Sequence, residues 1–192
     1  MKQELIIIVA IIVSIYITKR ECILIGRCLQ GIALCIFIMG HTIQIQFTYQ
    51  NIINTLLGYI VAPCIVFFLY RLIAGVKLNL IYIVKPDFKY FNSVIAEEVI
   101  FRFILYKCIY SVLIRVLNHY SILVFFIALI ITSVIFTCAH KIKFLYNKVE
   151  LFVFAIILQL VSIMLPGLNF GLHLGRNSYI SVLTQLQQEQ TC

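Results

Sequence analysis

The fold of this chain is decided by Val94–Leu105, which reads Val-Ile-Ala-Glu-Glu-Val-Ile-Phe-Arg-Phe-Ile-Leu. This stretch places two adjacent carboxylates, Glu97 and Glu98, and the guanidinium of Arg102 in a sequence that is otherwise apolar. A charged residue at the centre of a membrane helix costs roughly 2.5 to 3.5 kcal/mol on insertion scales, so the three charges together oppose insertion by about 7 to 10 kcal/mol. We therefore expect these three residues to have a use.

The spacing of the three charges predicts two different roles. A helix advances by about 100° per residue, so Glu98 and Arg102 lie on one face as an i, i+4 pair and can neutralise each other. Glu97 lies roughly 140° around the helix from Arg102. The spacing therefore predicts that Glu98 and Arg102 support the structure and that Glu97 is available for chemistry.

The composition excludes a soluble domain. The 192 residues are 63% hydrophobic and 11% charged, with a mean hydropathy of +1.08, and a water-facing surface needs far more charge than this. We therefore expect a polytopic membrane protein surrounded by membrane lipid. The formal net charge of +8 comes from basic residues in short connections between apolar runs, which predicts an orientation in the membrane rather than binding of nucleic acid.

Apolar runs of about 20 residues are long enough to cross the roughly 30 Å of hydrocarbon in a bilayer. Counting such runs predicts an all-α polytopic membrane protein with about seven transmembrane helices, within a range of roughly six to eight. Their expected positions are about residues 5–18, 22–40, 52–70, 91–113, 120–140, 150–165 and 168–186. We expect a single membrane domain, in which residues 1–90 supply the N-terminal helices and a basic interfacial segment at 71–90, and residues 91–192 form the functional core.

Basic residues in alternate connections predict the orientation. Nine of them fall on one side of the predicted membrane and three on the other, and the richer side is expected to face the cytoplasm. The nine are Lys19, Arg20, Arg71, Lys77, Lys85, Lys89, Lys141, Lys143 and Lys148, and the three are Lys2, Arg115 and Arg176. This orientation puts the start of the fourth helix and the end of the fifth at the cytoplasmic side, so Glu97 and His140 are expected to meet.

Two other apolar segments carry polar residues at helical spacing. His140 closes Phe136-Thr-Cys-Ala-His140, and His173 opens His173-Leu-Gly-Arg-Asn177, so each pair is i and i+4 and shares a face. Taken alone, His140 is explained as an interfacial side chain, and the pair on the last helix as a hydrogen-bonding contact between packed helices. The coincidence of three apolar segments, each with polar groups suited to hydrolysis, favours a common function.

The three motifs together resemble those of the CPBP intramembrane proteases, which are EExxxR, FxxxH and HxxxN. They are matched, in that order and at roughly the family's spacing, by Glu97–Arg102, Phe136–His140 and His173–Asn177. That family contains the type II CAAX prenyl endopeptidases and bacterial proteins linked to bacteriocin self-immunity. The resemblance covers about residues 91–186, and we expect the site between the fourth, fifth and seventh helices.

The resemblance implies a role for each polar residue. Glu97 would be the general base that activates a water, held also by His140, for attack on a peptide carbonyl. His173 and Asn177 would stabilise the tetrahedral oxyanion. The Glu98–Arg102 pair would hold the fourth helix in place.

The use of a metal is left open by the sequence. Glu97, His140 and His173 could form a zinc site with two histidines, one carboxylate and an open position for water. The family is commonly described as metalloproteases, yet a metal-free glutamate mechanism uses the same side chains. A divalent metal such as zinc is therefore one of two expectations.

Two features depart from the family pattern. Arg176 puts a charge immediately before Asn177, and we expect it to snorkel to the membrane surface, to bind a substrate carboxylate, or to lie in a wetter, re-entrant helix. His173 is expected about five residues from the outer end of its helix, which is nearer the far leaflet than Glu97. Tilt, a short sixth helix or a deep aqueous cavity would bring the two residues together.

Two functions follow from these expectations. The first is an intramembrane endopeptidase that cleaves a membrane-associated peptide or lipidated protein near the cytoplasmic face of a bacterial plasma membrane. The second is a non-enzymatic membrane immunity or interaction protein that retains the protease fold and uses the buried polar cluster for packing. A small transporter is disfavoured, because no inverted repeat of broken helices is visible.

Overall fold

In the computed structural model, the described residues form helices and short connections, with no strand among them. They are residues 2–20, 23–40, 48–74, 90–118, 122–142, 144–165 and 167–189. The helices α4 (Phe91–Glu97), η2 (Glu98–Leu105) and α5 (Tyr106–Leu117) follow one another without a break, so this part of the chain forms seven continuous helices. The predicted all-α class is confirmed, and the described residues form seven helices, whereas the prediction that about seven helices cross the membrane stays a prediction.

The chain divides into two compact units, which are described separately. The first unit comprises Met1–Gln46 and Glu97–Lys143, and the second comprises Phe47–Ala96 and Phe144–Cys192. Each unit thus takes residues from both sides of residue 90. The predicted boundary at residue 90 separates the N-terminal helices from the expected functional core, and it stays a prediction.

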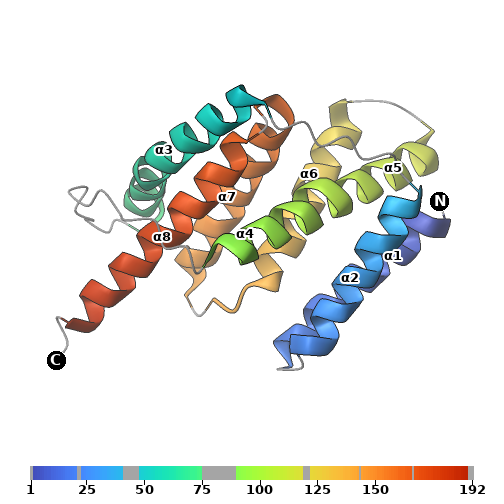
Figure 1. The fold of residues 1–192 in the computed structure, drawn as a ribbon, viewed down its shortest axis with the longest axis horizontal. Coiled ribbons are helices and arrows are strands. Elements are labelled where there is room, and N and C mark those ends of the chain that lie inside the picture. The colour runs from blue at the N-terminus through green and yellow to red at the C-terminus, as the bar shows by residue number, and fades with distance from the viewer. Residues whose placement is uncertain are drawn as a thin grey trace. The chain divides into compact units, whose positions relative to one another are not determined.

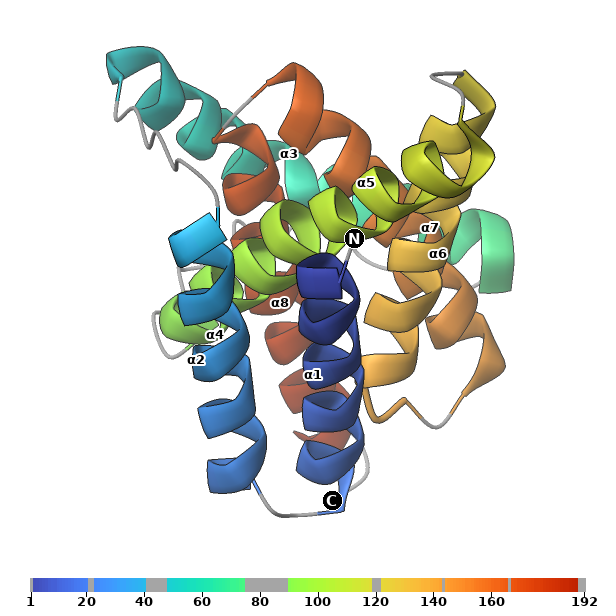
Figure 2. The same cartoon turned by 90° about the vertical axis from the view of Figure 1, so that its right-hand side faces the viewer.

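The first unit contains α1 (Lys2–Lys19), α2 (Ile23–Gly40), η2, α5 and α6 (Ile122–Ala139). The helices α1 and α2 lie side by side in Figure 1 and in the turned view of Figure 2. Buried residues recur at helical spacing on α1, and Ile7 and Ile11 are fully buried. Arg115, near the end of α5, holds Glu4, near the start of α1, with 2.8 Å between Nη2 and Oε1. These contacts anchor α5, which continues directly from η2.

The second unit is built on close packing between α3 (Tyr49–Ala74) and α8 (Leu168–Glu189). A Cβ atom at Gly171 would overlap the carbonyl oxygen of Thr55 on α3, and one at Gly175 would come within 2.7 Å of the carbonyl oxygen of Tyr59. Glycine at both positions therefore lets the two backbones touch, as small residues at four-residue spacing do between membrane helices.

An apolar core joins α7 (Leu145–Met164) to α3 and α8 in the same unit. Its buried members are Ala62, Val66, Leu69, Phe154, Leu158, Leu172 and Tyr179. The short helix α4 packs on α8 through Phe91 and Phe170, whose rings meet edge to face with centroids 5.4 Å apart. This core fixes α8, the helix that carries two of the predicted site residues.

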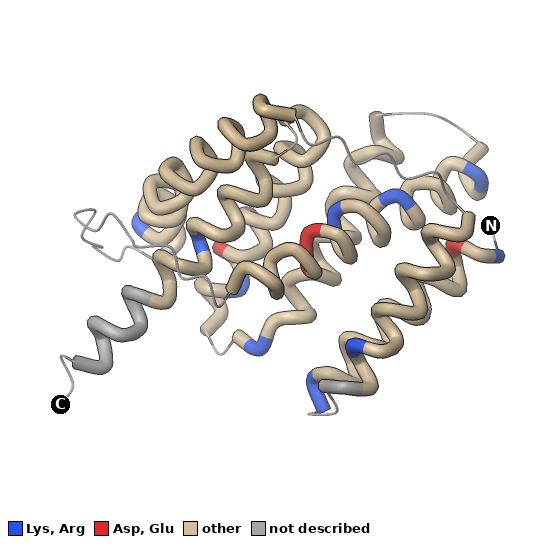
Figure 3. Tube along the Cα trace, viewed as in Figure 1, with Lys and Arg blue, Asp and Glu red and all other residues tan. Residues whose placement is uncertain are grey.

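Three helices of the described chain are long and apolar enough to cross a membrane. They cover Tyr49–Ile73, Ile122–Ala139 and Leu145–Met164, and Ile25–Gly40 is a shorter apolar helix. Each long span leaves large apolar side chains such as Ile60, Ile130 and Val149 exposed, as expected of a surface that faces lipid. Figure 3 shows long stretches of these helices without a charged residue. Such spans are typical of a multi-pass membrane protein.

The ends of α3 differ from the prediction. It begins at Tyr49 and continues to Ala74, so the expected loop at 41–51 and the expected interfacial segment at 71–90 both overlap helix at their margins. The apolar run simply continues through Arg71, whose side chain is exposed, because one cation at an exposed position does not stop a helix. The remainder of these two predictions falls on residues 41–47 and 75–89, which lie outside the described part of the chain.

Two further helix ends differ from the expected positions. The helix α5 ends at Leu117 rather than about residue 113, and Asn118 follows it with φ 48°, a left-handed conformation that asparagine tolerates. The helix α7 begins at Leu145 rather than about residue 150, because polar residues such as Lys148 occupy an exposed first part of the helix. As a result, Glu150 lies within α7 and not at its start.

Candidate active site

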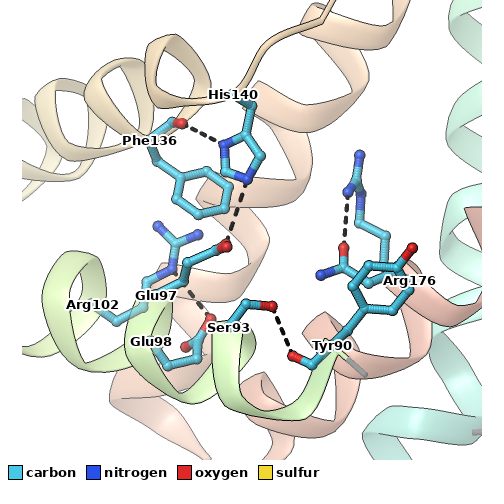
Figure 4. A network of polar contacts seen from close by, with 9 residues as sticks. Tyr90, Ser93, Glu97, Glu98, Arg102, Phe136, His140 and Arg176 are labelled. Atoms are coloured by element: carbon cyan, nitrogen blue, oxygen red, sulfur yellow. Dashed lines mark hydrogen bonds and ion pairs between the residues drawn. The ribbon is translucent and has the colours of Figure 1, made fainter. Parts of the chain in front are cut away.

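Glu97 and His140 meet in the first unit. Glu97 closes α4 immediately before η2, and His140 directly follows α6. The Nε2 atom of His140 lies 3.5 Å from Oε2 of Glu97 (Figure 4), and the two side chains are 31% and 25% exposed. Because α6 packs on η2, two residues that are far apart in the sequence come into contact.

A backbone contact fixes the hydrogen on the His140 ring. Its Nδ1 atom lies 2.9 Å from the carbonyl oxygen of Phe136. A carbonyl oxygen only accepts hydrogen bonds, so Nδ1 carries a hydrogen and donates it. In the neutral ring, Nε2 then has a lone pair and faces the Glu97 carboxylate as a second acceptor. Two acceptors that face each other need a shared proton or a bridging donor, and a water molecule is such a donor.

Glu98 and Arg102 lie in η2, a π-helical segment whose last hydrogen bond runs from the Tyr106 N–H to the carbonyl oxygen of Phe101. The Nε atom of Arg102 is 3.8 Å from Oε1 of Glu98, and the two side chains are only 3% and 9% exposed. Short π-helical segments are frequent at functional sites. This one buries an ion pair directly after Glu97.

Phe136 connects Arg102 to His140. The guanidinium carbon of Arg102 lies 4.3 Å from the centroid of the Phe136 ring. The ring of His140 lies on the same phenyl group, with centroids 4.6 Å apart, and the Phe101 ring meets it edge to face at 5.1 Å. Figure 4 shows Phe136 with Arg102, Glu97 and His140. The ring and the carbonyl oxygen of Phe136 therefore hold this part of the site in one arrangement.

His173 and Asn177 share one face of α8 in the second unit. They are i and i+4, and they lie roughly 160° around the helix from Gly171 and Gly175, which face α3. His173 is 1% exposed and Asn177 is partly buried. The glycine packing therefore turns both polar side chains away from α3.

Arg176 forms a buried ion pair that the sequence analysis did not predict. Its Nε and Nη2 atoms lie 2.9 and 2.6 Å from the two carboxylate oxygens of Glu150 on α7. Arg176 is 7% exposed and Glu150 is 1% exposed. We expected Arg176 to snorkel to the membrane surface, to bind a substrate carboxylate, or to lie in a wetter, re-entrant helix, and its guanidinium instead binds the carboxylate of Glu150. The signal was present as one acidic and one basic residue in consecutive apolar helices, each costly unless paired.

The described residues contain no group of three or more His, Cys, Asp or Glu side chains arranged to hold a metal ion. Glu97 and His140 supply two ligand atoms in the first unit, and His173 belongs to the second. A catalytic zinc site takes three protein ligands. The zinc site expected from these three residues therefore stays a prediction, and no step of the proposed reaction is assigned to a metal.

The chain matches no protein family model, no curated protein and no solved structure. The case for a function therefore rests on contacts within each unit. The structure brings Glu97 to His140 in the first unit, and it places His173 with Asn177 in the second. Whether the two pairs serve one substrate stays a prediction from the sequence.

Proposed function

We propose that the chain is an intramembrane endopeptidase that hydrolyses a peptide bond in a membrane-associated peptide or lipidated protein. The observation that carries the proposal is the pair of Glu97 and His140, in which the hydrogen bond from Nδ1 to the carbonyl oxygen of Phe136 leaves Nε2 facing the carboxylate at 3.5 Å. A water molecule beside the pair can donate a hydrogen bond to each of these two acceptors, which hold it and polarise it. An activated water held among apolar helices is the reagent that peptide hydrolysis in a membrane requires.

In the proposed reaction, the Glu97 carboxylate accepts a proton from this water while the water oxygen bonds to the peptide carbonyl carbon. His140 orients the water through Nε2. The carbonyl oxygen becomes an oxyanion, and the resemblance of the sequence motifs assigns its stabilisation to His173 and Asn177, which would donate hydrogen bonds to it. The carbon–nitrogen bond then breaks, the proton held by Glu97 passes to the leaving nitrogen, and the products are a carboxylic acid and an amine.

The proposed location is a bacterial plasma membrane, with Glu97 and His140 toward the cytoplasmic side. Support comes from the bias of basic residues between alternate connections. His140 directly follows α6 and precedes the exposed Lys141, as expected where a helix leaves the membrane on the side rich in basic residues.

The proposal is tested with the purified chain in proteoliposomes and quenched fluorescent peptides, with and without a lipidated cysteine. We expect Glu97→Gln and His140→Ala each to lower kcat by about 100-fold or more, because each removes one of the groups that activate the water. Glu4→Gln is the matched control, since Glu4 is a buried carboxylate of the same unit whose ion pair with Arg115 lies outside the proposed site.

Two results would overturn the proposal: cleavage of no peptide in the panel by the parent protein, or cleavage by Glu97→Gln at the parent rate. A chelator is added in parallel. If chelation abolishes cleavage and zinc restores it, a metal joins the same residues, whereas unchanged cleavage supports the metal-free reaction.

A second function, a non-enzymatic membrane immunity or interaction protein, is favoured by one observation. Glu98, Arg102 and Phe136 pack together almost out of contact with solvent, so they stabilise the first unit whether or not any reaction occurs. This function predicts that an inserted Glu97→Gln protein keeps the full phenotype of the parent.

A further inference from the structure

Arg176 donates hydrogen bonds in two directions. Its Nε and Nη2 atoms bind the two carboxylate oxygens of Glu150 at 2.9 and 2.6 Å. Its Nη1 atom donates to Oδ1 of Asn177 at 3.4 Å. The guanidinium carbon also lies 5.3 Å from the ring centroid of Phe154, one helical turn beyond Glu150 on α7. Two residues of α7 therefore hold the group that touches Asn177.

The pairing with Glu150 leaves the guanidinium of Arg176 one orientation. A guanidinium is planar, so two parallel bonds to one carboxylate fix both its direction and its rotation. Water competes little for these bonds, because Glu150 is 1% exposed and Arg176 is 7% exposed. The ion pair with Glu150 on the neighbouring helix α7 therefore holds the Nη1 atom of Arg176 toward Asn177.

This contact determines which end of the Asn177 amide faces Arg176. Every nitrogen of a guanidinium only donates, so the carbonyl oxygen Oδ1 fits beside Nη1 and the NH2 group does not. The NH2 group, Nδ2, then points away from Arg176. Without such a partner the two ends of an asparagine amide have nearly the same shape, and the amide rotates between them.

We infer that Arg176, held by Glu150, is a positioning residue that presents the NH2 group of Asn177 as the hydrogen-bond donor for the oxyanion. The inference rests on the proposed function, which gives Asn177 that role. The reversed amide would turn Oδ1 toward the developing negative charge and repel it. Arg176, the charged residue within the motif His173–Asn177, therefore sets the direction in which the Asn177 NH2 group points.

The orientation of the amide can be tested without a substrate. Protein labelled with 15N-asparagine in detergent micelles gives side-chain amide signals, and Asn177→Ala identifies those of Asn177. We expect Arg176→Gln and Glu150→Gln to shift these signals and to make their hydrogens exchange faster with solvent. Glu4→Gln and Arg115→Gln, which remove the ion pair of the other unit, are the matched controls and should leave them in place. Unchanged Asn177 signals in both α7–α8 variants would overturn the inference.

The effect on catalysis is tested with Arg176→Lys, which keeps a cation beside Glu150 but lacks the planar fork. We expect kcat to fall about tenfold with KM changed by less than about twofold, against a loss of about 100-fold for Asn177→Ala. The double variant should be no slower than Asn177→Ala alone, because Arg176 acts through that residue. Losses that multiply in the double variant would contradict a positioning role.

The two measurements separate this inference from the proposed function. One result would overturn this inference and leave the proposed function in place. In that result, cleavage depends on Glu97 and His140, but the Asn177 signals do not change when Arg176 or Glu150 is replaced. The opposite result would overturn the proposed function and leave the amide contact supported. In that result, the Asn177 signals change when Arg176 or Glu150 is replaced, but the parent protein cleaves no peptide.

Discussion

Phe136 lies beside Glu97 and contacts both Arg102 and His140. Its ring supports the guanidinium of Arg102 on one side and the imidazole of His140 nearby, and its carbonyl oxygen binds Nδ1 of that imidazole. A cation over an aromatic face contributes about 0.5 to 2 kcal/mol, depending on how far it is desolvated. One aromatic side chain thus contacts the charged group of Arg102 and the imidazole of His140 together.

Replacement of Phe136 by leucine separates these contributions. The backbone carbonyl is kept, so the tautomer of His140 should survive, but Arg102 and His140 lose the aromatic surface. We expect the free energy of unfolding in detergent to fall by about 1 to 3 kcal/mol. Phe126→Leu is the control, because Phe126 is 44% exposed on the same helix and should cost less than about 0.5 kcal/mol. Equal losses in the two variants would show that the contacts of Phe136 add nothing beyond its size.

At the residue scale, the sequence predicts contacts within one helix better than contacts between helices. The i, i+4 spacing placed Glu98 beside Arg102, because helical geometry alone decides that neighbour. The ion pair of Glu150 with Arg176 needed the packing of α7 on α8, which no local pattern contains. Arg176 therefore looked like an anomaly until its partner was known.

The packing of α8 on α3 depends on glycines, which have no side chain to separate the two helices. Gly58 on α3 and Gly171 and Gly175 on α8 leave no room for a Cβ atom beside the opposite backbone. Without a hydrophobic driving force between helices in lipid, such close approach is a main source of association. Because Gly171 and Gly175 face α3, the same packing also decides in which direction the face of α8 with His173 and Asn177 points.

Gly171→Ala tests this packing. A methyl group there overlaps the carbonyl oxygen of Thr55, so the helices must separate, and we expect a loss of about 1 to 3 kcal/mol in the free energy of unfolding. Gly31→Ala is the matched control, since no atom lies within 4 Å of the added carbon, and alanine there should be neutral or stabilise the helix by up to about 1 kcal/mol. Similar effects at both glycines would contradict the close packing of α3 and α8.

At the element scale, length and hydropathy were enough to predict seven helices, because an apolar run that must satisfy its own backbone has few alternatives. Helix ends were predicted less well, since Arg71 and Lys148 continue their helices at exposed positions. The glycines of α8 at four-residue spacing, Gly171 and Gly175, are a pattern that favours close packing of helices. The π-helical form of η2 has no pattern in the sequence that distinguishes it from an α-helix.

At the scale of the whole molecule, the arrangement of charge predicts how the chain lies in its membrane. The described residues contain three helices long enough to span, and their exposed side chains are largely apolar. The connection that contains Lys141 is expected on the cytoplasmic side, and the end of α5 that contains Arg115 on the opposite side. Both residues are exposed, so they are suitable reporters.

This orientation is checked by cysteine labelling in a background without the native cysteines. We expect Lys141→Cys to react with a membrane-impermeant maleimide in inside-out vesicles only, and Arg115→Cys in right-side-out vesicles only, because the reagent reaches one aqueous face in each case. Ile130→Cys, on the exposed apolar surface of α6, should react in neither. Labelling of Lys141→Cys from the outside would reverse the proposed cytoplasmic location of His140.

The π-helical segment η2 also controls angular phase along the chain. Its hydrogen bonds join residues five apart rather than four, so each residue turns the chain by less than the 100° of an α-helix. The buried face of α5 contains Cys108 and Ile109. The direction of this face relative to the carboxylates at the start of η2 depends on the number of residues in η2. Loss of one residue from 103–105 would keep the spacing from Glu97 to Arg102 and still turn α5 by somewhat less than about 100°. A motif can therefore survive intact in a chain whose carboxylates no longer face the right way.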